Sequence, residues 1–187
     1  MRKRLFISLL FLCALLLSAC AAQRAAPEAS APMATDTQAV SELDAFYQHP
    51  LAAAYGDVRK LDADYTAEQA QRDRCFVIGV TVHNDDLYTA FMANVEQRKD
   101  AFIRVVKTTV EGDPILYDIL YTGDTDAVQL VRDASRDAFA AEADREITLR
   151  SFAHIAEYAD GGALYWVAYD GAPDITGEDT FVIAQIR

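Results

Sequence analysis

The chain has 187 residues, 52% of them hydrophobic, and carries 29 Asp and Glu against 17 Lys and Arg, a formal net charge of −12. This length suffices for a domain with its own apolar core. The negative charge opposes binding to phosphate backbones or anionic lipid headgroups, so no nucleic-acid partner is expected.

The first residues have the pattern of an export signal. Basic residues 2–4 precede an apolar stretch at 5–17, which is shorter than the about 20 residues of a membrane-spanning helix but typical of a signal peptide. The stretch ends in Leu17-Ser18-Ala19-Cys20, which resembles the lipobox of bacterial lipoproteins. We predict cleavage before Cys20 and attachment of palmitate-bearing diacylglycerol to its thiol. The alternative is an ordinary secretory signal with a chance cysteine.

Lipid on Cys20 predicts a location at the cell membrane or outer membrane, facing outside the cytoplasm. Ala21, rather than Asp, follows it; by resemblance to sorted lipoproteins this permits delivery to an outer membrane. Residues 20–37 are rich in Ala, Pro and Ser and predict a disordered tether before a single domain at 38–187. Residues 1–19 hold three of the 17 basic residues and none of the 29 acidic ones, so the mature chain has a formal charge of −15.

Three helix starts follow in chain order. Ser41-Glu-Leu-Asp44 and Thr66-Ala-Glu-Gln69 have the spacing of capping boxes, and Pro50 ends the first helix. Asn84-Asp85-Asp86 predicts the cap and acidic first turn of the main helix. That helix has apolar residues at a helical spacing and basic residues after them: Leu87, Phe91 and Val95, then Arg98 and Lys99.

From residue 101 the apolar pattern changes to a period of two, which is typical of strands. Six strands are predicted at residues 102–110, 115–121, 128–132, 147–155, 164–169 and 181–186, and a further buried strand is predicted earlier, at residues 75–78. Short turns between consecutive strands favour antiparallel pairing. The prediction is an α+β fold: an antiparallel meander of about five to six strands, with the main helix and one or two short N-terminal helices packed on one face.

Residues 65–179 resemble a domain of bacterial lipoproteins, the domain of unknown function 4362. The resemblance rests on Thr66–Ala70, Asn84–Val95, Ile103-Arg-Val-Val106 running into Thr109–Ile115, and the segment from Asp133 to Asp137 with Phe139. It implies a lipoprotein with a single domain and brings no activity. The family pattern has two late cysteines able to pair, whereas this chain has none after Cys75, which argues against a shared disulfide.

Several polar clusters could form sites. Glu111-Gly-Asp-Pro114 could present two carboxylates to a cation, although a turn fits it better. His83 with Asp85 and Asp86 could begin a metal site but lacks a third ligand, and His49 and His154 are isolated in sequence. The loop with Asp170, Asp174, Glu178 and Asp179 suggests calcium, but Ala172 and Ile175 break the EF-hand pattern.

The remaining candidates are one thiol and a group of aromatic residues. Cys13 leaves with the signal and Cys20 carries lipid, so Cys75 has no partner for an intramolecular disulfide and is expected in the core. The aromatic residues could line an exposed sheet face, although core packing is their usual role: Tyr117, Tyr121, Tyr165, Trp166 and Tyr169.

No familiar catalytic motif occurs, and no catalytic residue, metal or cofactor is predicted. The main hypothesis is a non-enzymatic binding or interaction module at the cell envelope, with an envelope protein or a small ligand as partner and the membrane held through Cys20. The alternative is an envelope hydrolase or metal-dependent enzyme, in which His83 or His154 would meet carboxylates in one cleft.

Overall fold

The computed structural model describes residues 36–186, so the signal segment, Cys20 and most of the expected tether lie outside the described residues. The helices, in chain order, are α1 (Asp36–Gln48), α2 (Pro50–Tyr55), η1 (Val58–Lys60), α3 (Ala67–Arg72), α4 (Asp85–Glu96) and η2 (Glu142–Asp144). The strands are β1 (Phe76–Ile78), β2 (Val82–His83), β3 (Ala101–Thr108), β4 (Pro114–Thr122), β5 (Ala127–Asp133), β6 (Ile147–Phe152), β7 (His154–Asp160), β8 (Ala163–Tyr169) and β9 (Thr180–Gln185).

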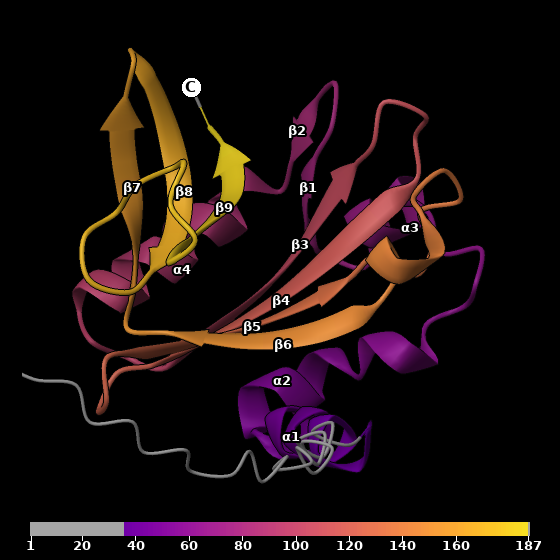
Figure 1. The fold of residues 1–187 in the computed structure, drawn as a ribbon, viewed down its shortest axis with the longest axis horizontal. Coiled ribbons are helices and arrows are strands. Elements are labelled where there is room, and N and C mark those ends of the chain that lie inside the picture. The colour runs from indigo at the N-terminus through magenta and orange to yellow at the C-terminus, as the bar shows by residue number, and fades with distance from the viewer. Residues whose placement is uncertain (1–35, 187) are drawn as a thin grey trace, which may run out of the picture. The chain divides into compact units, whose positions relative to one another are not determined.

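The strands form two sheets, which confirms the α+β class. The larger has the order β2-β1-β3-β4-β5-β6, and the smaller has the order β7-β8-β9 (Figure 1). All pairs are antiparallel except β1 with β3, which run parallel. The expected meander therefore holds from β3 to β6 and again from β7 to β9.

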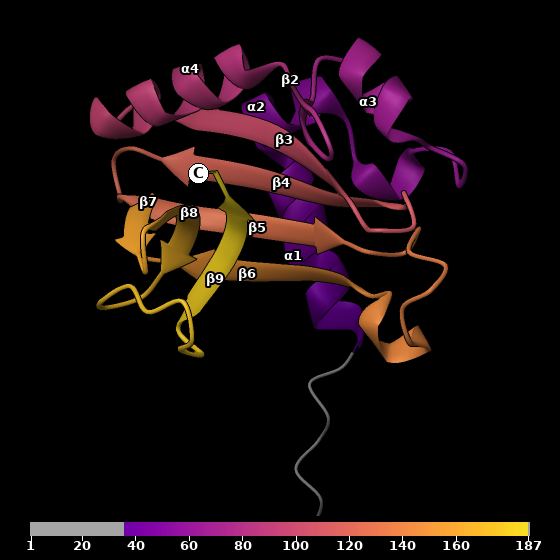
Figure 2. The same ribbon diagram turned by 90° about the horizontal axis from the view of Figure 1, so that it is seen from above.

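Side chains cover both faces of the six-stranded sheet. Figures 1 and 2 show α1 and α2 on one face, and α4 with the three-stranded sheet on the other. Leu43 and Phe46 of α1 pack in one buried cluster with Val106 and Leu116. The opposite cluster joins α4 and both sheets through residues that include Phe91, Ile103, Ile119, Trp166 and Ile183.

The main helix α4 thus lies on the opposite face from α1 and α2, where one shared face was expected. The parallel pairing of β1 with β3 requires a crossover connection, and α4 forms it by packing on the sheet face opposite α1 and α2. The predicted apolar stripe of α4 is confirmed, since Phe91 is buried and Leu87 and Val95 pack against the same cluster.

The single strand expected at 147–155 is instead two strands in different sheets. Phe152 and Ile155 are both buried, which breaks the alternation of a regular strand, while Ala153 and His154 between them are exposed. The backbone N–H of Ala153 donates to Asp170 Oδ1 at 2.7 Å. The chain therefore leaves the six-stranded sheet at this point and enters the smaller one.

One of the three predicted helix starts is confirmed as a capping motif, and the other two differ from the sequence prediction. The Thr66–Gln69 capping box is confirmed, with Gln69 N donating to Thr66 Oγ1 and Thr66 N donating to Gln69 Oε1. The first helix starts at Asp36 rather than Ser41 and ends before Pro50, which opens α2. Asn84 precedes α4 in a left-handed conformation, and its amide donates to the carbonyls of Gln71 and Cys75 instead of capping the helix.

Candidate functional site

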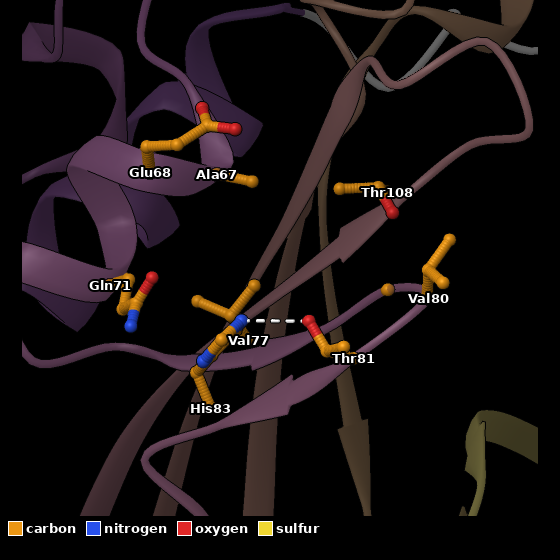
Figure 3. A pocket seen from close by; sticks show the side chains of 9 residues that line it. Ala67, Glu68, Gln71, Val77, Val80, Thr81, His83 and Thr108 are labelled. Atoms are coloured by element: carbon orange, nitrogen blue, oxygen red, sulfur yellow. Dashed lines mark hydrogen bonds between the residues drawn. The ribbon is translucent and has the colours of Figure 1, made fainter.

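The hairpin of β1 and β2 separates two hollows in the surface. Its residues alternate between them because successive side chains of a strand point to opposite faces. The first, the hairpin hollow, has a volume of about 220 Å³ and lies between α3 and the hairpin (Figure 3). Its lining residues are Ala67, Glu68, Gln71, Val77, Gly79, Val80, Thr81, His83 and Thr108.

His83 is the titratable ring of the hairpin hollow. Its Nε2 lies 2.8 Å from Thr81 Oγ1, and Figure 3 shows this contact on the hairpin side of the hollow. Within residues 36–186 no hydrogen bond joins this ring to a carboxylate, and no three metal-ligating side chains gather around it. A hydroxyl within hydrogen-bond distance of an imidazole is part of a nucleophile–base arrangement, but within residues 36–186 no carboxylate is hydrogen-bonded to this ring to orient it.

The second hollow, the inter-sheet cleft, opens between the two sheets and has a volume of about 310 Å³. Its walls come from β1, β2, α4, β7, β9 and the residue after β9: Phe76, Ile78, Val82, Asp85, Tyr88, Thr89, Glu157, Gln185 and Ile186. Tyr88 of α4 donates to Glu157 Oε1 of β7 at 2.7 Å, so a hydrogen bond ties the helix to the smaller sheet. Five of these nine residues are aromatic or aliphatic and four are polar or charged, so the cleft combines apolar walls with several hydrogen-bonding groups.

Trp166 lies behind the walls of this cleft. Its ring meets Tyr88 edge-on with centroids 4.9 Å apart, and its centroid is 6.5 Å from that of Phe76. The side chain is fully buried, and its Nε1–H has no hydrogen-bond partner among the residues described. An unpaired buried donor costs about 1–3 kcal/mol. Phe76 and Tyr88 of the cleft wall therefore pack against a tryptophan whose indole N–H has no hydrogen-bond partner among the residues described.

A buried ion pair lies on the other face of the sheet. Arg104 of β3 donates to Asp118 of β4 through Nε at 2.6 Å and Nη2 at 2.7 Å, and Tyr47 of α1 donates to the same carboxylate at 2.9 Å. Arg104 Nη2 also donates to the Gly56 carbonyl after α2. Burial alone would lower the pKa of Arg104, but hydrogen bonds and charge from Asp118 raise it above its ordinary value.

This network holds the N-terminal helices against the sheet, and our sequence analysis did not predict it. The available signal was a charged residue inside each of two apolar strand patterns, Arg104 between Ile103 and Val105 and Asp118 between Tyr117 and Ile119. The two are direct cross-strand partners. To predict this ion pair from the sequence, one would have to know which residues of β3 and β4 lie opposite each other.

The middle of the chain matches a known family. Residues 72–160 match the family model described as Domain of unknown function (DUF4362). This segment is therefore similar to the DUF4362 domain. The match runs from the end of α3 to the end of β7 and so contains the hairpin, α4 and the remaining strands of the six-stranded sheet. Comparison with curated proteins and with solved structures gave no match. Among the helices of residues 36–186, none has the length and apolar character needed to cross a membrane.

Two segments that suggested the DUF4362 resemblance have structural roles. Glu111–Asp113 lie in the turn between β3 and β4 and Pro114 starts β4, as the turn interpretation predicted, and Gly112 adopts a φ of 101°. Asp133 accepts from Ser135 N and from Arg136, whose guanidinium also donates to the Leu61 carbonyl. The segment after β5 is therefore fastened to the region around η1.

The other cluster residues singled out in the sequence lie apart. His49 accepts from Leu51 N at the start of α2, and the His154 ring packs 5.2 Å from that of Tyr169. Asp174 accepts from the backbone and hydroxyl of Thr176 within its own loop. Within the described residues, no group of three His, Cys, Asp or Glu side chains could hold a metal ion.

The core expectations for the thiol and several aromatic residues are confirmed. Cys75 is buried beside the Tyr65 hydroxyl, which lies 3.8 Å from its Sγ, and burial raises the pKa of the thiol. Tyr117, Tyr121 and Trp166 are buried, while Tyr165 and Tyr169 are half-buried. An exposed aromatic sheet face is not formed; the apolar hollow lies between the sheets instead.

Proposed function

We propose that this protein is a lipid-anchored, non-enzymatic binding module of the bacterial cell envelope, and that the inter-sheet cleft receives an apolar group of its ligand. The lipobox at Cys20 supports the anchor and the location outside the cytoplasm. The single observation that carries binding is the apolar cleft between two sheets. Ligand sites are commonly concave and mostly apolar, with few polar groups that fix orientation.

The chemistry of the cleft suits recognition. Phe76, Ile78 and Val82 offer apolar contact, and the Tyr88–Glu157 pair offers an oriented hydroxyl and a carboxylate. A volume of about 310 Å³ fits a bulky side chain or a small ring system. The carboxylates of the lining, Asp85 and Glu157, favour a ligand that combines an apolar body with a hydrogen-bond donor or a positive charge.

Trp166 provides a reporter for the cleft, since it is the only tryptophan of the chain and touches two wall residues. The probe is N-phenyl-1-naphthylamine, a neutral apolar fluorophore, titrated into the purified protein. We expect saturable binding with quenching of Trp166 through energy transfer. Val82→Asp should weaken binding at least tenfold, because it places a charge on an apolar wall.

Val110→Asp is the matched control, since Val110 is an exposed valine at the turn of another hairpin. It should leave the titration unchanged. Absence of saturable binding, or equal losses in both variants, would contradict the cleft as a binding site.

The anchor is tested by metabolic labelling with an alkyne analogue of palmitate in a bacterial host. Cys20→Ser should abolish the label, whereas Cys75→Ser should retain it, because Cys75 is a buried core thiol. Label that persists in Cys20→Ser would contradict lipidation at that residue.

A further inference from the structure

Three loops meet at one end of the six-stranded sheet. They are residues 79–81 between β1 and β2, residues 109–113 between β3 and β4, and residues 134–146 between β5 and β6. Because β1 runs parallel to β3, and β3 to β6 alternate in direction, all three connections lie at the same end (Figures 1 and 2). Neighbouring strands are about 4.8 Å apart, so the three loops span about 20 Å.

The loops are in contact along this end. A Cβ added to Gly79 would lie 2.8 Å from Thr108 Oγ1, which shows how closely the first loop approaches the end of β3. The backbone N–H of Ala138 donates to Asp113 Oδ2 at 2.8 Å, which joins the second loop to the third. The three loops therefore form one continuous surface, which we name the loop-end surface.

Each loop carries a bulky apolar side chain in solvent. The relative exposure is 107% for Val80, 99% for Val110 and 73% for Phe139. Single exposed apolar residues are ordinary, but three on adjacent loops form a group that core packing does not explain. Turns of this kind normally carry polar residues.

Hydrogen bonds hold the longest loop in shape. Asp137 Oδ1 accepts from Phe139 N and Ala140 N, and Arg145 donates to the carbonyls of Ala138 and Ala140. Phe139 is therefore presented from a fastened segment, which lowers the ordering cost of binding.

The charge of the loop-end surface is negative. Glu111, Glu142, Asp144 and Glu146 are exposed in these loops. The basic residues of the third loop bend inward: Arg136 pairs with buried Asp133 with its side chain only 8% exposed, and Arg145 is held by carbonyls. Among the described residues of these three loops, the exposed charged side chains are therefore carboxylates, while Lys107 and Arg132 at the nearby ends of β3 and β5 are half-buried.

We propose that the loop-end surface docks onto a basic face of another protein, with Val80, Val110 and Phe139 as its apolar contacts. Charge complementarity selects this partner, since opposite potentials favour association and like charges oppose it. A second copy would bring carboxylates against carboxylates, and an anionic membrane would repel them. This surface is separate from the inter-sheet cleft, so the two proposals can fail independently.

The experiment places the photocrosslinking residue p-benzoylphenylalanine at position 110 or 139 of the full chain, expressed in its own host. Positions 40 and 51 are the matched controls, because Val40 and Leu51 are exposed apolar residues on α1 and α2. We expect one discrete protein adduct from 110 and 139, none from 40 and 51, and an unchanged adduct with Val82→Asp in the cleft.

The partner identified in the adduct is then purified without crosslinking and titrated against the parent protein. Val110→Ser with Phe139→Ser should weaken binding at least tenfold, and Glu111→Gln with Glu142→Gln should weaken it several-fold and reduce its salt dependence. Adducts only with lipid, adducts with a second copy, equal adducts at the control positions, or no adduct would each overturn the proposal. A purified partner that binds the surface variants as tightly as the parent would overturn it as well.

Discussion

Arg104 and Asp118 face each other across β3 and β4 with side-chain exposures of 3% and 0%. Charges at this depth are tolerated because each is matched: the carboxylate accepts from the guanidinium and from Tyr47, and the guanidinium donates also to the Gly56 carbonyl. A buried pair adds little net stability compared with apolar residues, but removal of one partner leaves an uncompensated charge.

Asp118→Leu should therefore destabilise the fold by about 3–5 kcal/mol, because Arg104 and the Tyr47 hydroxyl lose their partner. Urea denaturation followed by Trp166 fluorescence measures this change. Arg104→Leu with Asp118→Leu should recover part of the loss. The control is Asp86→Leu, which breaks the exposed pair with Arg74 and should cost at most about 1 kcal/mol. If Asp118→Leu costs no more than the control, the buried network does not stabilise this protein.

The Cys75 thiol is a second test at this scale. Burial raises its pKa and its side chain is 1% exposed, so both the thiolate fraction and reagent access are low. In the domain of residues 38–187, which contains only this cysteine, we expect the reaction with Ellman's reagent to be at least 100-fold slower in the native than in the urea-unfolded protein. Rapid labelling of the native domain, with unchanged Trp166 fluorescence, would show an accessible thiol instead.

At the scale of elements, the start of α3 is set by a local motif. Thr66 and Gln69 satisfy each other's backbone N–H groups, and α3 begins directly after Thr66. Thr66→Ala should cost about 1 kcal/mol, a typical value for an N-cap. Thermal denaturation of the variant measures it. Thr125→Ala is the matched control, because this exposed threonine makes only a long contact of 3.5 Å to Thr122 O. Equal shifts in melting temperature would argue against the cap.

Signals of this kind could be predicted because they lie within a few residues of one another. The Thr66 box, the apolar stripe of α4 and the turn at Gly112 each depend on local spacing. The face on which α4 packs could not be predicted in this way. It depends on the parallel pairing of β1 with β3 and on the path of the crossover between them, and these two strands are separated in sequence by a helix.

The break at Ala153 was missed for a related reason. Residues 147–155 contain no glycine or proline, and the local sign of the change of sheet is only a shift of the apolar positions from 147 and 149 to 152 and 155. The change depends on Asp170, seventeen residues later, which accepts from Ala153 N. The inter-sheet cleft was likewise hidden, since Phe76, Tyr88 and Ile186 come together only when both sheets are assembled.

At the scale of the whole molecule, buried tyrosines connect stability to pH. Burial is the largest cause that raises the pKa of Tyr47, Tyr65 and Tyr121, with neighbouring Asp118, Cys75 and Asp126 adding to it. The pKa of Tyr121 rises to about 12. Tyr47 and Tyr65 pack in the cluster on one face of the six-stranded sheet, and Tyr121 packs in the cluster on the other face. Ionisation of these hydroxyls therefore affects the stability of the whole domain.

Below pH 10 a phenol is neutral in both the folded and the unfolded chain, so these residues cause no pH dependence there. Above pH 10 the unfolded chain loses the protons and the folded chain keeps them, so the free energy of unfolding must fall as pH rises towards 12. Each tyrosine contributes up to about 1.4 kcal/mol per pH unit. We expect cooperative alkaline unfolding, in which absorbance at 295 nm and Trp166 fluorescence change together. Tyr121→Phe should make the dependence less steep. Ionisation of all nine tyrosines near pH 10 with an unchanged Trp166 spectrum would mean that these hydroxyls are open to solvent in the native fold.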